Sequence, residues 1–402
     1  MATVEKRRIL FVLFDGLPRT VIDSQVLMHA REMAEEGDLA FEIWSFACGA
    51  GLYRASKARL EEAREMAGCP VRVFRAIWFA LPFSILGNAL WLAALLSWYR
   101  PRFEVVHARG DFTAAVLGYL RLVRPFRLLW DQRGDGEAEF AADFQAGTPA
   151  RRLAKWAKIQ SIRWRVRVAA LCCDAAFFVS DALRRRMEGS FRNKPYRIVP
   201  CAASQALFHY DPALRARMRR ALGYGEDDQV LVYCGGLASY QCFPETVALF
   251  ARLHRRNPGC RLLVVTPRVE AALPLLEALP KGSWRTASAG LAEVGGYLNA
   301  ADAAFLLREV SAINAVAAPT KFAEYCLTGL PVCVTEGVPE YYRMASREGN
   351  LCRVEDDALV LPRDYDRAAV AERYAGLLSR EALRKRYREL YARWDVAPSR
   401  TA

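Results

Sequence analysis

The chain has 402 residues, of which 53% are hydrophobic and 25% are charged, and its formal net charge is +13. This composition excludes a disordered, fibrous or low-complexity protein, and the length is typical of two domains rather than one. The 11 cysteines show no metal-ligand spacing, so we expect reduced core thiols in a cytosolic protein and no metal site.

The first strand is expected at Ile9 to Phe14, directly after the short charged segment Met1 to Arg8. Such a start lacks the features of a signal peptide, which favours a cytoplasmic protein. Gly16 follows the strand, and a helix is expected from Asp23 or Ser24. A glycine turn between strand and helix is where open α/β sheets bind ligands, so Gly16 is a candidate phosphate contact, although any tight turn also favours glycine.

Strand-like runs recur through the first half of the chain, separated by helical stretches, and this alternation predicts a parallel sheet with helices on both faces. The expected strands are Phe41 to Ala47, Val71 to Ile77, Phe103 to Ala108, Arg127 to Asp131, Ala175 to Ser180 and Tyr196 to Pro200. Arg133 follows the fourth of these strands, at the carboxyl end where sites are built. Its guanidinium could bind a phosphate or carboxylate through two hydrogen bonds, and an ordinary surface arginine is the alternative.

One stretch of this half is long and apolar. Ala76 to Tyr99 contains no charged residue, and its length would permit a membrane span. Pro82, Gly87 and Asn88 argue against a span. We therefore expect a buried helix of the sheet domain or a helix partly sunk in a bilayer interface, and we favour burial.

A second stretch is basic. Ala150 to Ala169 interleaves Arg and Lys with Trp156 and Trp164, a composition typical of an interfacial anchor or of a solvated basic helix. Residues 151–200 carry 13 Lys or Arg against 3 Asp or Glu. Each basic residue near an anionic bilayer contributes about 1 kcal/mol of attraction. No nucleic-acid-binding motif accompanies the basic residues, so we expect an anionic membrane surface as partner and no nucleic acid.

The second half of the chain repeats the alternation and predicts a second parallel sheet. Its expected strands are Val230 to Tyr233, Leu262 to Thr266, Trp284 to Ala287, Ala303 to Leu307 and Val332 to Thr335. A glycine-rich turn with Gly235, Gly236 and Gln241 follows the first of them.

A compact helix of about ten residues is expected between the last two strands, with Pro319 in its first turn and Gly329 just past its end. Lys321 and Glu324 share one face of this helix close to Thr320, where free N–H groups and the helix dipole attract anions. A cation, a carboxylate and an anion-binding helix start together suit a nucleoside diphosphate, whose ribose hydroxyls would donate to the carboxylate. A plain surface ion pair is the alternative.

The segment Pro319 to Tyr325, followed by Gly329 to Val332, resembles the retaining GT-B glycosyltransferases of glycosyltransferase family 4, especially bacterial members with a Pro-x-Lys-x-x-Glu-Tyr motif. The resemblance implies two Rossmann-like parallel-sheet α/β domains facing a central cleft. Residues 1–203 would bind the acceptor, residues 204–381 would bind the nucleotide sugar, and a helix at about 382–402 would cross back to the first domain.

The resemblance also implies roles for single residues. Glu324 would hold the ribose, and Thr320 and Asn314 would contact the donor. The backbone amides of the loop with Gly235 and Gly236 would stabilise the donor phosphates. Lys321 and Arg308 would act as catalytic cations.

Other positions that the resemblance covers depart from the family pattern. Many members have a sugar-contacting glutamate at Val316, and the glycine-rich loop usually has an arginine and a lysine at Gly236 and Gln241. Arg133 stands where a histidine commonly faces the donor sugar. We therefore expect Lys321 and Arg308 to supply the positive charge that the glycine-rich loop lacks.

The function that these features predict is metal-independent transfer of a sugar, with retained configuration, from a nucleoside-diphosphate sugar to a lipid-linked or polysaccharide acceptor. The reaction would serve cell-envelope polysaccharide biosynthesis at the inner face of the cell membrane, with no cofactor besides the donor. One alternative is an inactive GT-B homologue that acts as the membrane-bound partner of another transferase, and the missing cations favour it. Another is a nucleotide-sugar epimerase, which needs acid and base groups that the sequence does not reveal. The histidines, His29, His107, His209 and His254, are dispersed along the chain.

Overall fold

The computed structural model describes residues 6–19, 21–77, 84–143, 147–191 and 193–392. The chain forms two compact units, an N-terminal unit of residues 1–199 and 384–402 and a C-terminal unit of residues 200–383. The sequence placed this boundary at residue 203. The backbone explains the difference, because the N–H of Ala203 donates to Leu378 O (3.2 Å) and Arg380 donates to the carbonyl of Ala203 (3.0 Å). These bonds tie residue 203 to the end of the C-terminal unit.

The N-terminal unit contains a seven-stranded sheet in the order β3-β2-β1-β4-β5-β6-β7, with every adjacent pair parallel. Its strands are β1 (Arg7–Leu13), β2 (Leu39–Ala47), β3 (Val71–Arg75), β4 (Val105–Arg109), β5 (Arg127–Gln132), β6 (Ala175–Phe178) and β7 (Tyr196–Ile198). The first-half strands were thus predicted in number and kind. The run expected from Phe103 begins only at Val105, and the run expected to reach Ser180 ends at Phe178, where Ser180 instead caps a helix through its hydroxyl.

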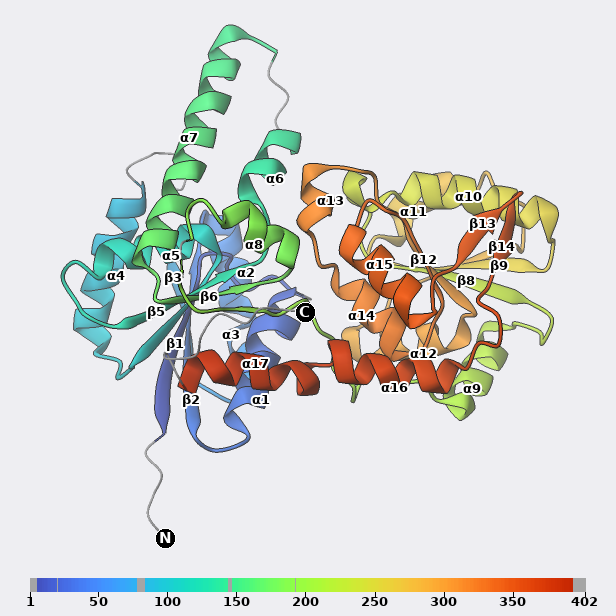
Figure 1. Ribbon diagram of the computed structural model, residues 1–402, viewed down its shortest axis with the longest axis horizontal. Coiled ribbons are helices and arrows are strands. Elements are labelled where there is room, and N and C mark those ends of the chain that lie inside the picture. The colour runs from blue at the N-terminus through green and yellow to red at the C-terminus, as the bar shows by residue number, and fades with distance from the viewer. Residues whose placement is uncertain (1–5, 20, 78–83, 144–146, 192, 393–402) are drawn as a thin grey trace. The chain divides into compact units, whose positions relative to one another are not determined.

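Helices cover both faces of this sheet (Figure 1). They are a π-helical turn η1 (Asp23–Leu27), α1 (Met28–Ala34), α2 (Ala50–Ala58), α3 (Leu60–Ala67), α4 (Ser84–Tyr99), α5 (Gly110–Leu120), α6 (Gly136–Asp143), α7 (Pro149–Cys172), α8 (Asp181–Met187) and, from residue 384 on, α17 (Arg380–Ala392). On one face α5 packs between α4 and α7. The N-terminal half of α7 rises from the unit together with α6, as Figure 1 shows.

The apolar stretch from Ala76 corresponds in part to α4, and residues 78–83 of it lie outside the described residues. Helix α4 buries Ile85, Leu92 and Leu96 and exposes Trp98, so it is a half-buried covering helix. Within the described part of the chain, no helix combines the length and the apolar character that crossing a bilayer requires.

The C-terminal unit is built around a five-stranded parallel sheet in the order β10-β9-β8-β11-β12. Its strands are β8 (Gln229–Cys234), β9 (Cys260–Val265), β10 (Trp284–Ala287), β11 (Ala303–Leu306) and β12 (Val332–Val334), and a separate antiparallel hairpin joins β13 (Arg353–Glu355) to β14 (Ala358–Val360). Its helices are α9 (Pro212–Leu222), the 3₁₀ turn η2 (Ser239–Gln241), α10 (Phe243–Arg256), α11 (Val269–Leu276), α12 (Leu291–Ala300), α13 (Ala312–Val316), α14 (Thr320–Leu327), α15 (Pro339–Glu348) and α16 (Arg367–Leu378). The second parallel sheet that the sequence predicted is therefore present.

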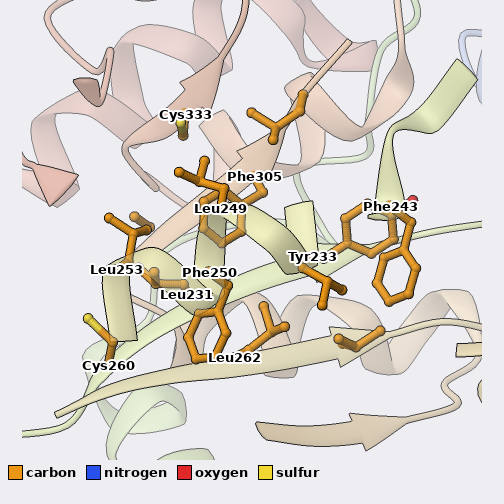
Figure 2. Close-up of a cluster of buried hydrophobic side chains, with 14 of the residues drawn as sticks. Leu231, Tyr233, Phe243, Leu249, Phe250, Leu253, Cys260, Leu262, Phe305 and Cys333 are labelled. Carbon is orange, nitrogen blue, oxygen red and sulfur yellow. The ribbon is translucent and has the colours of Figure 1, made fainter. Parts of the chain in front are cut away.

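The core of the C-terminal unit lies between this sheet and α10. Figure 2 shows Leu249, Phe250 and Leu253 of the helix against Leu231 and Leu262 of the strands. Buried strands of a parallel sheet are apolar along their whole length because helices cover both faces, which is why β8 and β9 read as continuous apolar runs. The loops at the carboxyl ends of the strands begin at this core.

Candidate functional site

The strand order of the C-terminal unit marks where a ligand would bind. From β8 the chain goes first to β9 and β10 on one side, and then crosses to β11 and β12 on the other. The switch point therefore lies between β8 and β11, and open α/β sheets bind ligands at the carboxyl ends of the strands there. Gly235 and Gly236 follow β8, and Arg308 follows β11 closely.

Gly235 makes room for the side chain of Lys321. A methyl group at Gly235 would lie 2.0 Å from Lys321 Cε, and its φ of +133° is rarely adopted by other residues. The N–H of Gly235 donates to Val265 O (2.8 Å) and is committed to the sheet. This glycine thus brings a cation to the end of β8, but its own amide does not offer a free donor as the sequence led us to expect.

Lys321 lies in a partly buried polar setting. Its Nζ donates to Oε1 of Gln241 and stands 5.0 Å from the ring centroid of Tyr233. The hydroxyl of Tyr233 donates to Gly236 O (2.6 Å) and contacts the Gln241 oxygen at 3.3 Å. Burial, and then the charge of Arg308, lowers the pKa of Lys321 to about 8. The ammonium is therefore held in a defined place and is still charged at neutral pH.

Arg308 is buried behind the same loop. Its Nη1 donates to the backbone oxygens of Gln241 (3.1 Å) and Leu307 (2.8 Å), and its backbone N–H donates to the hydroxyl of Thr335 (2.8 Å). Burial lowers its pKa from the usual value. Gln241 therefore contacts both cations, one through its side chain and the other through its backbone.

Glu324 occupies the same helix face as Lys321, one turn further along α14. Burial raises the pKa of its carboxyl to about 7, although the charges of Lys321 and Arg380 oppose the rise. Among the described residues the carboxylate accepts no hydrogen bond. A desolvated carboxylate of this kind would gain from accepting hydrogen bonds from ligand hydroxyls.

Two further residues predicted for this site occupy different settings. Thr320 is the first residue of α14 and partly buried, so it lies beside Lys321 as the sequence predicts. Asn314 is buried on α13, where its Nδ2 donates to Glu309 O (3.1 Å), so its amide holds the loop after β11. The helix that carries the site spans Thr320–Leu327, and Gly329 adopts φ +65° just beyond it, as the sequence predicts.

In the N-terminal unit, Gly16 is buried and required by packing. Its φ is +67°, and a methyl group there would lie 2.9 Å from side-chain atoms of Leu52 and Ser56 on α2. Its N–H donates to Phe46 O (3.0 Å). The phosphate role expected for Gly16 has no support from this geometry, because both its amide and its free side are occupied by the protein.

Arg133 belongs to a buried polar network at the carboxyl end of β5. Its Nε donates to the Asp131 carboxylate (2.8 Å), and its Nη2 donates to the hydroxyl of Tyr387 (2.6 Å). Burial alone would raise the pKa of Asp131, but the charge of Arg133 and the hydrogen bond from His107 outweigh it and hold the pKa below the usual range. Arg133 is thus fixed by an ionised carboxylate rather than free at the surface.

The network continues through two histidines that sequence reasoning treated as dispersed. His107 Nε2 lies 3.2 Å from Asp131, and its Nδ1 lies 2.7 Å from the hydroxyl of Tyr391. His29 Nε2 contacts the same hydroxyl at 3.1 Å. Burial lowers the pKa of His107. Tyr391 is on α17, near the other end of the sequence, so no local pattern could have revealed the cluster.

Within the described parts of the chain, no three His, Cys, Asp or Glu side chains come together as a metal site would require. The groups brought together in the C-terminal unit are thus two cations, one carboxylate and a glutamine, arranged at the switch point of a parallel sheet. Such a set suits an anion that also carries hydroxyl groups.

No known family model matches the chain, and no curated protein matches it either. Solved structures match the chain in fold. Sucrose-phosphate synthase from Thermosynechococcus elongatus superposes with a TM-score of 0.64 at 16% identity, covering 96% of this chain and 98% of its own. HepE from Anabaena, solved with UDP and glucose, superposes with a TM-score of 0.62 at 12% identity, covering 96% of this chain and 99% of its own.

A putative UDP-N-acetylglucosamine 2-epimerase from Listeria monocytogenes is a more distant match, with a TM-score of 0.51 at 11% identity over 95% of this chain and 90% of its own. At these identities the likeness concerns the fold. The chain has two parallel-sheet α/β domains of the kind found in GT-B glycosyltransferase structures, which confirms the predicted fold class.

Proposed function

We propose that this protein is a glycosyltransferase that uses a nucleoside-diphosphate sugar as donor. The observation that carries the proposal is the convergence of Lys321, Arg308 and Glu324 at the switch point between β8 and β11. HepE, similar in fold, was solved with UDP and with UDP-glucose, which supports a uridine nucleotide as the first donor to test.

In the proposed reaction the bond between the anomeric carbon and the diphosphate oxygen breaks, and a bond to the acceptor oxygen forms on the same face of the sugar. The acceptor's proton passes to the leaving phosphate, so configuration is retained and no protein nucleophile is needed. Lys321 and Arg308 stabilise the charge that develops on the diphosphate. Glu324 accepts hydrogen bonds from the ribose hydroxyls and fixes the nucleoside.

The acceptor is proposed to bind on the N-terminal unit and to be lipid-linked or a growing polysaccharide of the cell envelope. Helix α7 supports this, since it exposes Leu153 and Trp156 among Arg151 and Arg152. Basic and aromatic side chains together suit the headgroup region of an anionic bilayer. The protein would then act at the inner face of the cell membrane.

Thermal shift with UDP, GDP, ADP and their sugar conjugates tests the donor site. A nucleotide at 100 times its dissociation constant should stabilise the protein by roughly 2.7 kcal/mol. Glu324→Ala should abolish the shift for the nucleotide that wild type binds. Glu270→Ala, an exposed change on α11 of the same unit, should leave the shift intact.

Two results would contradict parts of the proposal. Nucleotide binding that survives Glu324→Ala would refute the site. Binding of a nucleotide sugar without transfer to any acceptor would favour the inactive-partner alternative, and interconversion of sugar epimers would favour the epimerase.

A further inference from the structure

A basic cavity lies on the opposite edge of the N-terminal sheet from the carboxyl ends of its strands. It has a volume of about 720 Å³. Residues at the starts of β1 and β4 and near the ends of α4 and α5 line it. Its cationic lining residues are Lys6, Arg8, Arg100, Arg102 and Arg124. The volume falls in the range of small-molecule sites, roughly 300 to 1,000 Å³.

The charge of this cavity is not balanced by the protein. The acidic residue of its lining is Glu104, whose Oε2 lies 3.6 Å from Nε of Arg7, a residue outside the lining. Among the described residues, none of the five lining cations forms an ion pair with a carboxylate. Like charges gathered in one concave surface raise the local concentration of anions.

Arg100 is held there at a conformational cost. It is the residue just after α4, its N–H donates to Leu96 O (3.0 Å), and its φ is +47°. This left-handed position at a helix end is usually taken by glycine, and another residue costs about 1 kcal/mol or more. Folding alone therefore favours glycine at this position, which makes Arg100→Gly a replacement that the backbone accepts.

Arg124 is also positioned by the cavity wall. Its guanidinium lies 5.1 Å from the ring centroid of Phe103, which also lines the cavity. A cation stacked on an aromatic ring keeps its outer N–H groups available for a planar or tetrahedral anion. The cavity thus offers one stacked guanidinium, that of Arg124, beside the exposed cations Arg8, Arg100 and Arg102.

We propose that this cavity, defined here as the amino-edge pocket, binds a phosphate-bearing anion of at least two negative charges. Guanidinium groups recognise phosphate through paired hydrogen bonds, which makes phosphate the best match for a pocket with four arginines. The proposal is independent of the donor site, because every residue it uses lies in the N-terminal unit.

Two sources can supply this chemistry, a soluble polyphosphate and the headgroup of a phospholipid. The lipid source is worth testing because strongly exposed apolar side chains neighbour the cations in sequence. Trp98 is 83% exposed, Leu122 is 79% exposed and Val123 is 78% exposed. They could enter a bilayer whose headgroups occupy the pocket.

The test uses the full chain and two probes. Inorganic pyrophosphate is titrated calorimetrically at low salt, and vesicles of phosphatidylcholine with or without phosphatidic acid are used for flotation. The informative variant is Arg100→Gly, because glycine relieves the positive φ and should leave the melting temperature unchanged or higher. Loss of one charge-assisted contact should weaken binding by at least about tenfold.

Matched variants separate this pocket from other basic sites. Arg54→Ala removes an exposed arginine of α2 and should bind as wild type does. Lys321→Met removes the cation of the proposed donor site, where pyrophosphate would also bind. Arg100→Gly is therefore compared with its parent in the Lys321→Met background, where the amino-edge binding should remain.

The outcomes either support or overturn the proposal. Pyrophosphate binding that Arg100→Gly weakens identifies a soluble phosphate, and vesicle binding alone that Arg100→Gly weakens identifies a headgroup. Absence of both, or binding that Arg100→Gly leaves intact, overturns it.

Discussion

At the scale of single residues, the proposed donor site contains two ionisable groups whose charged forms are destabilised by burial. Lys321 and Glu324 both lie where burial opposes their charge, so the pKa of the lysine falls to about 8 and that of the glutamate rises to about 7. Perturbed values of this kind cluster at functional sites. Because the charged forms are poorly solvated in the free protein, a ligand that pairs with them recovers free energy on binding.

Glu324→Gln should stabilise the protein at alkaline pH. The folded state holds the proton of Glu324 more tightly than the unfolded state, whose pKa is about 4.5, so this stabilisation is complete below pH 4.5 and is lost as pH rises through 7. Glutamine keeps a neutral side chain at every pH. We expect its unfolding free energy to equal that of wild type near pH 4.5 and to exceed it by on the order of 2 kcal/mol near pH 8.5, after a discount for partial exposure.

Urea denaturation across this pH range measures the difference. Glu270→Gln, at an exposed position of α11, should show no pH-dependent difference from wild type. A Glu324→Gln protein that is less stable than wild type at pH 8.5 would show that the carboxylate is not held in a desolvated setting.

Lys321→Met should lower turnover much more than it raises the Michaelis constant, because the ammonium acts mainly on charge that develops as the diphosphate leaves. Loss of one such group lowers kcat by about 10² to 10³. In wild type, kcat/KM should rise through pH 7 as Glu324 ionises and fall above pH 8 as Lys321 loses its proton.

Steady-state kinetics of donor use checks both statements, with Lys281→Met as the control at an exposed lysine of the same unit. The high-pH limb should disappear in Lys321→Met. An unchanged kcat would remove Lys321 from the mechanism.

At the scale of secondary structure, much of the site helix could be predicted. Pro319 precedes α14, where its missing backbone N–H costs no helix hydrogen bond, and Gly329 follows the helix, where it adopts a positive φ. Both effects depend only on the local sequence. Apolar runs located the strands because they too are a local feature of the sequence. The ends of the strands were predicted less accurately. Phe103 was expected to begin a strand, but it precedes β4 and lines a cavity.

Side-chain contacts between distant elements could not be predicted. Gln241 looked like the loss of a cation, but the structure shows it accepting a hydrogen bond from Lys321. His29 and His107 looked unrelated until Tyr391 joined them. Such pairings depend on how strands order within a sheet and on where the last helix docks, and neither is encoded in a local spacing.

Tyr391→Phe should destabilise the N-terminal unit. It removes the hydroxyl that contacts both histidines and leaves two buried ring nitrogens without that partner, which costs about 1 to 3 kcal/mol. Urea denaturation followed by tryptophan fluorescence should report this loss, because Trp44 and Trp130 are buried in the same unit. Tyr53→Phe, at a partly exposed tyrosine of α2, should change little.

Nucleotide binding separates a structural role from a catalytic one. Since the proposed donor residues Lys321, Arg308 and Glu324 belong to the C-terminal unit, Tyr391→Phe should bind nucleotide with wild-type affinity. An unaltered unfolding free energy would show that the histidine contacts do not hold α17 in place.

At the scale of the whole chain, the two units differ in what they expose. The C-terminal unit brings Lys321, Arg308 and Glu324 together at one switch point, whereas the N-terminal unit carries exposed tryptophans and exposed arginines on its helices. On α7, Arg163 is paired with Glu137 (2.6 Å), so reversing its charge would also disturb α6. Arg151, Arg152 and Arg167 are exposed and are the better probes of a membrane contact.

Flotation with liposomes should separate the electrostatic and apolar parts of a contact through α7. Attraction between Arg151, Arg152 and Arg167 and anionic lipid is screened over about 8 Å at physiological salt and should weaken as salt rises, whereas insertion of Trp156 should not. We expect the triple change of these arginines to Glu to abolish salt-sensitive flotation, and Trp156→Ala to remove a salt-resistant fraction. The triple change of Arg217, Arg255 and Arg363 to Glu, at exposed positions of the C-terminal unit, controls for net charge. Wild-type protein that fails to float with anionic vesicles even at low salt would assign the basic face of α7 to a partner other than a bilayer.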